Sequence, residues 1–100
     1  LVIELYHQNL LARGAFVLDG RRVDLGAITA PVMTVIGLRD HIVPPPCARA
    51  IRPMLRAPYR ELALDAGHVG VFVSRKARGA VAEGLAAWLD DQAVRAASRV

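Results

Sequence analysis

The sequence predicts an α/β protein whose two principal strands run parallel. The stretch 32–37 is apolar and β-branched on both faces, which is typical of a strand buried on both sides. A second short strand is predicted over 60–64, and a helical stretch follows each strand. Strand, helix, strand and helix in this order favour a right-handed crossover. Because two parallel strands do not make a stable sheet alone, and the chain starts at Leu1, we expect the C-terminal portion of a larger sheet.

Composition excludes several classes of protein. The 100 residues are 54% hydrophobic, which is too apolar for a disordered chain. A single cysteine cannot form an internal disulfide and favours a reducing compartment. No stretch approaches about 18 consecutive apolar residues, and no secretory leader is visible, so we expect no membrane span. The net charge is +4, but the basic residues are scattered without interleaved aromatics, so we expect no nucleic-acid surface.

The first third of the chain predicts a helix end and a hairpin. In 1–14, Ile3, Tyr6 and Leu10 stand at i, i+3 and i+7, and Gly14 marks the helix stop. The segment 15–30 is predicted to be a small hairpin and a connection, because Asp19-Gly20 lies between alternating apolar residues.

The segment 31–92 carries the predicted strand-helix-strand-helix unit. Pro44-Pro45-Pro46 can open the first helix, and Pro53 is expected to disturb it. Its apolar stripe is Ala48, Ile51, Met54 and Leu55. Ser74 is a candidate N-cap for the last helix, whose stripe is Val81, Leu85, Trp88 and Leu89. The periodicity is lost from Gln92, so 93–100 is predicted to be a fraying tail.

Asp40 and His68 are the candidate catalytic residues. Asp40 is the third residue after the first predicted strand and His68 the fourth after the second, and ligands of open α/β sheets bind beyond the carboxyl ends of the strands. Adjacent strands lie about 4.8 Å apart, so the two loops can bring carboxylate and imidazole together. Such a pair activates a Ser or Cys nucleophile. The order acid, then histidine, matches that of α/β-hydrolases, but no G-x-[SC]-x-G elbow is present, so we expect the nucleophile upstream.

Each of these residues also has an ordinary structural interpretation. Asp40 can be a turn or cap residue before the prolines, and His68 between glycines can be structural. His41 is interpreted as a loop-packing or second-shell residue. A metal site of Asp40, His41 and His68 has no supporting ligand spacing, so no metal is expected. Cys47, near a helix N-terminus, is an alternative nucleophile, but a half-buried packing role is favoured because it lacks an elbow.

Four spaced motifs resemble the polyhydroxyalkanoate (poly-3-hydroxybutyrate) synthases. Residues 5–11 with Gly14 resemble L-Y-x-x-N-x-L…G, and 20–32 resembles G-x-x-V-D-L-x-x-I-x-x-P-V. Residues 40–45 resemble the D-H-[IL]-V-P loop. Residues 67–77 resemble the histidine loop G-H-[IV]-G-x-x-V-S-x-K-A, in a form closer to the two-component synthases than to the single-subunit type.

The resemblance implies that 1–100 is the C-terminal part of one α/β-hydrolase-type catalytic domain. It implies an acyltransferase that polymerises 3-hydroxyacyl-CoA into a growing polyester and releases CoA, without a cofactor. His68 would be the base, Asp40 its acid partner, Gly67 a second-shell residue, and the nucleophile a cysteine upstream. A second synthase subunit and a homo-oligomer are implied partners, and the location is cytoplasmic, at the surface of polymer granules. The fragment alone is expected to be inactive.

Two other functions remain open from the sequence. An esterase or polymer depolymerase of the α/β-hydrolase type would use the same Asp40–His68 pair with an upstream serine. A non-enzymatic binding module would carry the two residues incidentally. The residue in the upstream elbow distinguishes the first alternative, and independent folding of the 100-residue chain would favour the second.

Overall fold

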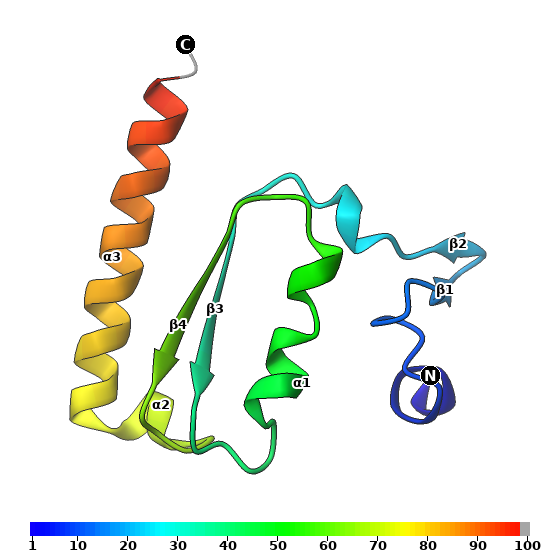
Figure 1. Ribbon diagram of the computed structural model, residues 1–100, viewed down its shortest axis with the longest axis horizontal. Coiled ribbons are helices and arrows are strands. Elements are labelled where there is room, and N and C mark those ends of the chain that lie inside the picture. Colours follow the sequence, from blue (N-terminus) through cyan, green and yellow to red (C-terminus); the bar gives the residue numbers. More distant parts are fainter. Residues whose placement is uncertain (99–100) are drawn as a thin grey trace.

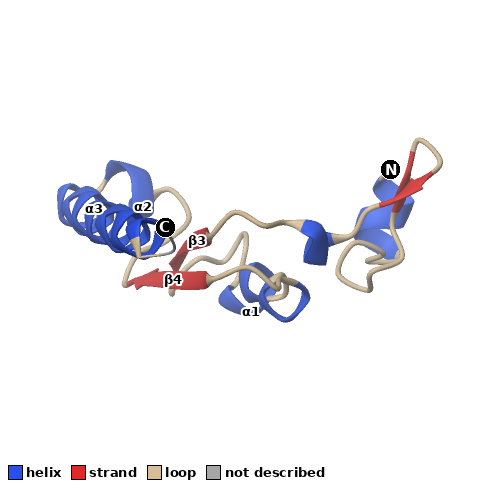
Figure 2. Cartoon of the chain, turned by 90° about the horizontal axis from the view of Figure 1, so that it is seen from above, coloured by secondary structure: helices blue, strands red, loops and turns tan. Residues whose placement is uncertain are grey.

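The computed structural model describes residues 1–98, and its centre is a parallel two-stranded sheet. Strands β3 (Val32–Gly37) and β4 (Tyr59–Leu64) pair in register from Val32↔Tyr59 to Gly37↔Leu64. Helix α3 (Arg75–Ala97) covers one face and helix α1 (Pro45–Arg49) the other (Figures 1 and 2). Successive side chains of β4 alternate accordingly: Glu61 meets α1 and Leu62 meets α3. The predicted α/β class and the parallel pairing are confirmed.

Burial of β3 on both faces was expected, and the structure corrects this for part of the strand. Ile36 is 4% exposed, but Val35 is 41% exposed. Across residues 1–98 the sheet has only two strands, so neighbouring elements cover only part of each face. The two strands are also joined through side chains, since the hydroxyl groups of Thr34 and Tyr59 lie 2.6 Å apart.

The crossover between the strands is a broken helix, as the prolines predict. Helix α1 starts directly after Pro44, and the prolines at its first positions need no N–H partner. It ends at Arg49, and the 3₁₀ turn η3 (Arg52–Met54) contains Pro53. A proline there cannot continue the α-helical hydrogen bonds, which explains the break.

The C-terminal helix is longer than the sequence pattern indicated. Ser74 caps α3 as predicted, its hydroxyl oxygen accepting from the N–H of Ala77 at 3.4 Å. The predicted tail is wrong where the structure describes it, because α3 continues to Ala97 and residues 99–100 lie outside the described part. Helix-favouring alanines and the Arg95–Asp91 ion pair, at i and i+4, support this last stretch without an apolar stripe.

The core lies where α2 (Gly70–Val73) and α3 meet β4. The sequence did not predict α2. The buried cluster consists of Leu64, Ala66, Val71 and Ala77, with Leu62, Ala80 and Val81 packed against it. Of the predicted α3 stripe, Val81 and Trp88 are half-buried, whereas Leu85 and Leu89 are exposed. Small residues let α3 approach the sheet: a Cβ on Gly84 would lie only 2.9 Å from Leu62.

The N-terminal third lies apart from the sheet, on the far side of α1 (Figure 1). The predicted helix is wrong beyond one short piece, the π-helix η1 (Ile3–His7). Ile3 and Tyr6 are 60% and 84% exposed, so two of the three residues of the expected stripe remain largely uncovered by the rest of residues 1–98. The helix also ends at His7 rather than at the predicted stop; Gly14 does adopt the left-handed conformation expected there, with φ +70°, but it lies in a turn.

The predicted hairpin is also confirmed. Strands β1 (Val17–Leu18) and β2 (Arg21–Arg22) pair antiparallel. Asp19 and Gly20 both have positive φ, 50° and 75°, as a tight hairpin turn requires. The 3₁₀ turn η2 (Leu25–Ala27) follows, capped by the carboxylate of Asp24, and leads into β3.

Candidate active site

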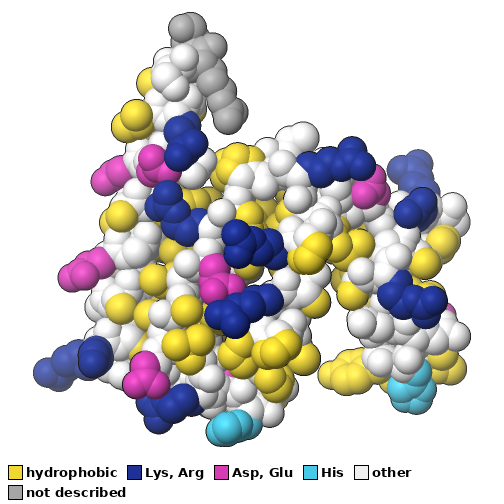
Figure 3. Space-filling model, in the orientation of Figure 1, with side chains coloured by type: hydrophobic (Ala, Val, Ile, Leu, Met, Phe, Trp, Pro, Cys, Tyr) yellow, Lys and Arg dark blue, Asp and Glu magenta, His cyan; other side chains and the backbone are white. Residues whose placement is uncertain are grey.

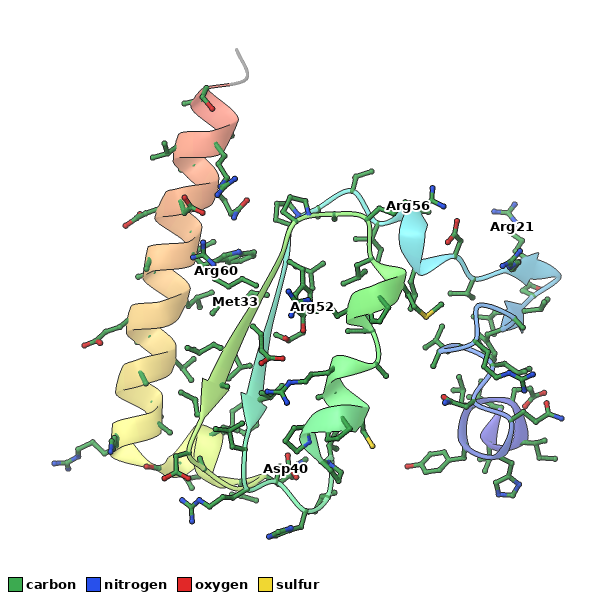
Figure 4. All side chains as sticks on the ribbon, in the orientation of Figure 1. Arg21, Met33, Asp40, Arg52, Arg56 and Arg60 are labelled. Atoms are coloured by element: carbon green, nitrogen blue, oxygen red, sulfur yellow. The ribbon has the colours of Figure 1, made fainter. Side chains whose placement is uncertain are left out.

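Asp40 lies in the tight loop that leaves the carboxyl end of β3 (Figure 4). Its N–H donates to the carbonyl of Gly37 at 3.1 Å. One carboxylate oxygen, Oδ1, accepts from the backbone N–H groups of Ile42 and Val43 at 2.9 and 2.8 Å. The expected structural role of Asp40, as a turn residue before the prolines, is therefore correct. This role occupies only Oδ1 of the carboxylate.

The second carboxylate oxygen binds His68. Nδ1 of His68 lies 2.9 Å from Oδ2 of Asp40. The Asp40 side chain is 11% exposed and that of His68 42% exposed. The histidine comes from the loop after β4, so the two loops meet at the same edge of the sheet. With Nδ1 held by a carboxylate, the ring presents Nε2 as its free nitrogen, which is the arrangement of a general base oriented by an acid.

The carboxyl of Asp40 is favoured in its charged form. Partial burial acts to raise its pKa, but the N–H of Val43, the ring of His68 and the N–H of Ile42 together lower the pKa below its ordinary value of 3.8. A carboxylate that stays ionised can both fix the tautomer of His68 and stabilise the imidazolium that forms during proton transfer.

Further hydrogen bonds tie the Asp40 loop to the His68 loop. The N–H of Leu38 donates to Leu64, and the N–H of Arg39 donates to the carbonyl of Ala66 at 3.1 Å. The guanidinium of Arg39 donates to Oδ1 and to the carbonyl of Asp65, at 2.8 and 3.0 Å. The Arg39–Asp65 ion pair was not predicted from the sequence; its only signal there is that opposite charges follow the two strands at nearly equivalent positions.

A cavity of about 220 Å³ opens beside the pair. Its lining is apolar apart from Asp40 and His68; the other residues are Val35, Ile36, Gly37, Val43, Ala48, Val71 and Phe72. Apolar side chains of the adjoining α2 and its N-cap project outward, with Val69, Phe72 and Val73 between 60% and 74% exposed. The pair therefore stands at the margin of an apolar surface.

The remaining candidate residues lie outside this arrangement. His41 is exposed and does not line the cavity, and Gly67 is half-buried directly before His68. The half-buried packing role expected for Cys47 is wrong, because its side chain is exposed on α1; it lines a different cavity of about 370 Å³, between α1 and the N-terminal segment. Within residues 1–98, no group of three or more His, Cys, Asp and Glu side chains is arranged to hold a metal ion.

Two surface properties complete the description. Arginine and lysine side chains are spread over the face seen in Figure 3, with hydrophobic side chains between them, rather than gathered into one patch. No helix in the described part of the chain combines the length and the apolar character needed to cross a membrane.

Sequence comparison relates the chain to one group of curated proteins. It is 40% identical over 90 residues to the poly(3-hydroxyalkanoate) polymerase subunit PhaC of Allochromatium vinosum and 36% identical over 90 residues to that of Thiocystis violacea. The PhaC subunit of Haloferax mediterranei is 29% identical over 90 residues. Each match covers 89% of this chain. By sequence, the chain is similar to one segment of these PhaC subunits.

The chain spans only part of its synthase relatives. The matched segment is 25% of the length of the Allochromatium and Thiocystis proteins and 18% of that of the Haloferax protein. No family model and no solved structure matches the chain. The family resemblance predicted from the four motifs is confirmed.

Proposed function

We propose that this synthase segment supplies the histidine and the aspartate of a Cys-His-Asp triad in an acyltransferase that polymerises 3-hydroxyacyl-CoA thioesters. The contact of 2.9 Å between His68 Nδ1 and Asp40 Oδ2, at the carboxyl ends of adjacent parallel strands, carries the proposal. The names of the relatives supply the reaction class, since they are poly(3-hydroxyalkanoate) polymerase subunits.

The proposed reaction has two acyl transfers. Nε2 of His68 accepts the proton of the cysteine thiol, and the thiolate attacks the thioester carbonyl of the substrate. The bond from that carbon to the CoA sulfur breaks, and CoA leaves with the proton from His68. His68 then accepts the proton of a 3-hydroxyl group, whose oxygen attacks the acyl-cysteine thioester. An ester forms, and the cysteine sulfur is released and reprotonated.

Asp40 acts through His68 in both transfers. Its charge stabilises the imidazolium each time the ring is protonated, and its second oxygen is held by the loop, so the acceptor is already oriented. The apolar lining next to Asp40 and His68 would help to exclude water. Exclusion matters because water would hydrolyse the acyl-enzyme before the polyester chain is extended.

The rest of the proposal concerns the whole protein. The cysteine comes from a G-x-C-x-G elbow of an α/β-hydrolase fold outside this segment, and Cys47 is not that nucleophile because it lines a separate cavity. The form of the histidine loop favours the two-component type, which pairs with a second subunit. In this proposal the complete protein also forms homo-oligomers and acts at the surface of cytoplasmic polymer granules.

The test uses the complete polypeptide that contains this chain, with 3-hydroxybutyryl-CoA as substrate. His68→Ala is expected to abolish both CoA release and the acyl-enzyme detected by mass spectrometry, whereas wild type shows both. Acyl-enzyme formation by His68→Ala at the wild-type rate would contradict the proposal. Acylation of a serine instead of a cysteine would assign the pair to a hydrolase of the same fold.

A further inference from the structure

Gly37, the last residue of β3, is buried against the backbone of the loop that carries His68. Its backbone is not among those with positive φ, so the conformation alone does not require glycine. The lack of space does require glycine, because a Cβ at this position would lie 2.6 Å from the carbonyl oxygen of Ala66 and 3.2 Å from that of Gly67. Both obstructing atoms belong to the backbone, so a side-chain rotation cannot relieve the contact.

The obstructing oxygen is also part of the link between the loops. The carbonyl of Ala66 accepts the N–H of Arg39 at 3.1 Å. Ala66 stands two residues before His68, and Arg39 directly precedes Asp40. The separation of the backbones at Gly37 therefore determines how closely the His68 loop lies against the Asp40 loop.

We propose that Gly37 is a positioning residue, whose missing side chain lets the two loops approach closely enough for Asp40 to hold His68. The catalytic consequence rests on the proposed function, whereas the geometric consequence does not. A methyl group here must displace the Ala66 carbonyl, and His68 moves with it because only Gly67 separates the two residues.

Gly84→Ala is the matched control. Its new Cβ would also be crowded, at 2.9 Å, but by the end of the Leu62 side chain in the interface of α3 with β4. Neither Gly84 nor Leu62 lines the cavity beside the pair. The two variants thus add the same atom at similarly tight places, and only one of these places links the Asp40 and His68 loops.

The experiment compares both variants with wild type in the complete polypeptide. A histidine Nδ1–H bonded to a carboxylate gives a downfield proton resonance, which reports the Asp40–His68 bond without any need for activity. Gly37→Ala is expected to lose this resonance and to lower kcat by about 10²-fold, with KM nearly unchanged. Gly84→Ala is expected to keep the resonance and the wild-type kcat, even if its Tm is lower than that of wild type.

Retention of the resonance and of kcat in Gly37→Ala would overturn the proposal, as would equal losses in Gly84→Ala. If circular dichroism shows that Gly37→Ala does not fold in buffer, all three proteins are compared in trimethylamine N-oxide, which favours the folded state. A refolded Gly37→Ala that keeps the resonance and kcat of wild type would overturn the proposal. If wild type shows the resonance but no transferase activity, the proposed function fails while the positioning role stands.

Discussion

Oδ2 of Asp40 lies 2.9 Å from Nδ1 of His68, although 28 positions separate the two residues in the sequence. The parallel register of β3 with β4 accounts for this proximity, because both loops leave the sheet at one edge. The other oxygen of the same carboxylate holds the loop through Ile42 and Val43. A single side chain thus shapes the loop and orients the histidine.

Replacing Asp40 by Asn should separate these two roles. The amide oxygen can still accept the two loop N–H groups, but the amide nitrogen then faces Nδ1 and favours the tautomer whose Nε2 carries the proton. That ring cannot act as a base, so kcat should fall by about 10⁴-fold while the fold persists. Steady-state CoA release and circular dichroism measure the two effects. Near-wild-type kcat in this variant would show that Asp40 serves only the loop.

Stability should decline in acid partly through Asp40. Its pKa is lower in the folded protein than the ordinary 3.8, so its contribution is complete above about pH 4 and is lost as pH falls through the lower folded value. Chemical denaturation of the complete polypeptide between pH 2 and 7 would show this decline. Asp40→Asn should decline less steeply over the same acid range, and parallel curves would contradict the prediction.

Cys47 should be dispensable for chemistry. It is exposed on α1 and lines a cavity from which Asp40 and His68 are absent. Cys47→Ala should keep most of the CoA-release activity and still form the acyl-enzyme, while His68→Ala should form none. A Cys47→Ala variant that folds but forms no acyl-enzyme would make Cys47 the nucleophile and refute its assignment here.

Leu64 should be a principal contributor to stability near the site. It is 9% exposed and joins the cluster of Ala66, Val71 and Ala77. Leu64→Ala should lower the free energy of unfolding by about 2–5 kcal/mol through lost burial and a residual cavity. Leu64→Met, which nearly conserves volume, should cost less than about 1.5 kcal/mol. Urea denaturation compares the two, and equal effects would show that packing at this position is loose.

The 100-residue chain on its own should release no CoA from 3-hydroxyacyl-CoA. The proposed nucleophile is not part of it, and β3 pairs with β4 along only one edge in the described residues. An open parallel edge promotes association with other chains, so we also expect aggregation or partial unfolding in size-exclusion chromatography. Measurable turnover, or a stable monomer with cooperative unfolding, would contradict this view of the segment.

Local signals in the sequence predicted the features that local chemistry controls. Asp19-Gly20 specifies its turn through positive φ, and Ser74 specifies its cap through a hydroxyl that the helix needs. The juxtaposition of Asp40 with His68 followed from one further rule, the common edge of parallel strands. The Arg39–Asp65 link and the close approach at Gly37 depend on backbone distances that residue spacing does not encode.

Periodicity failed where packing decides the outcome. Ile3, Tyr6 and Leu10 have helical spacing, but nothing in residues 1–98 covers the first two, and Asn9 adopts a φ of +50° that ends the helical backbone. At the other end, α3 persists to Ala97 although its apolar stripe has ended. Helix propensity and the pairing of Asp91 with Arg60 and Arg95 are sufficient there.

The prolines after the Asp40 loop limit the conformational entropy of the chain beside the candidate site. Pro44 at the end of this connection and Pro45 and Pro46 in the first turn of α1 restrict φ even in the unfolded chain, so this part of the chain loses less entropy on folding. A ligand entering beside His68 meets a carboxylate that is already immobile, and its affinity is not reduced by ordering this loop. Replacing the triplet with glycines would therefore weaken ligand binding by the entropy needed to order this segment.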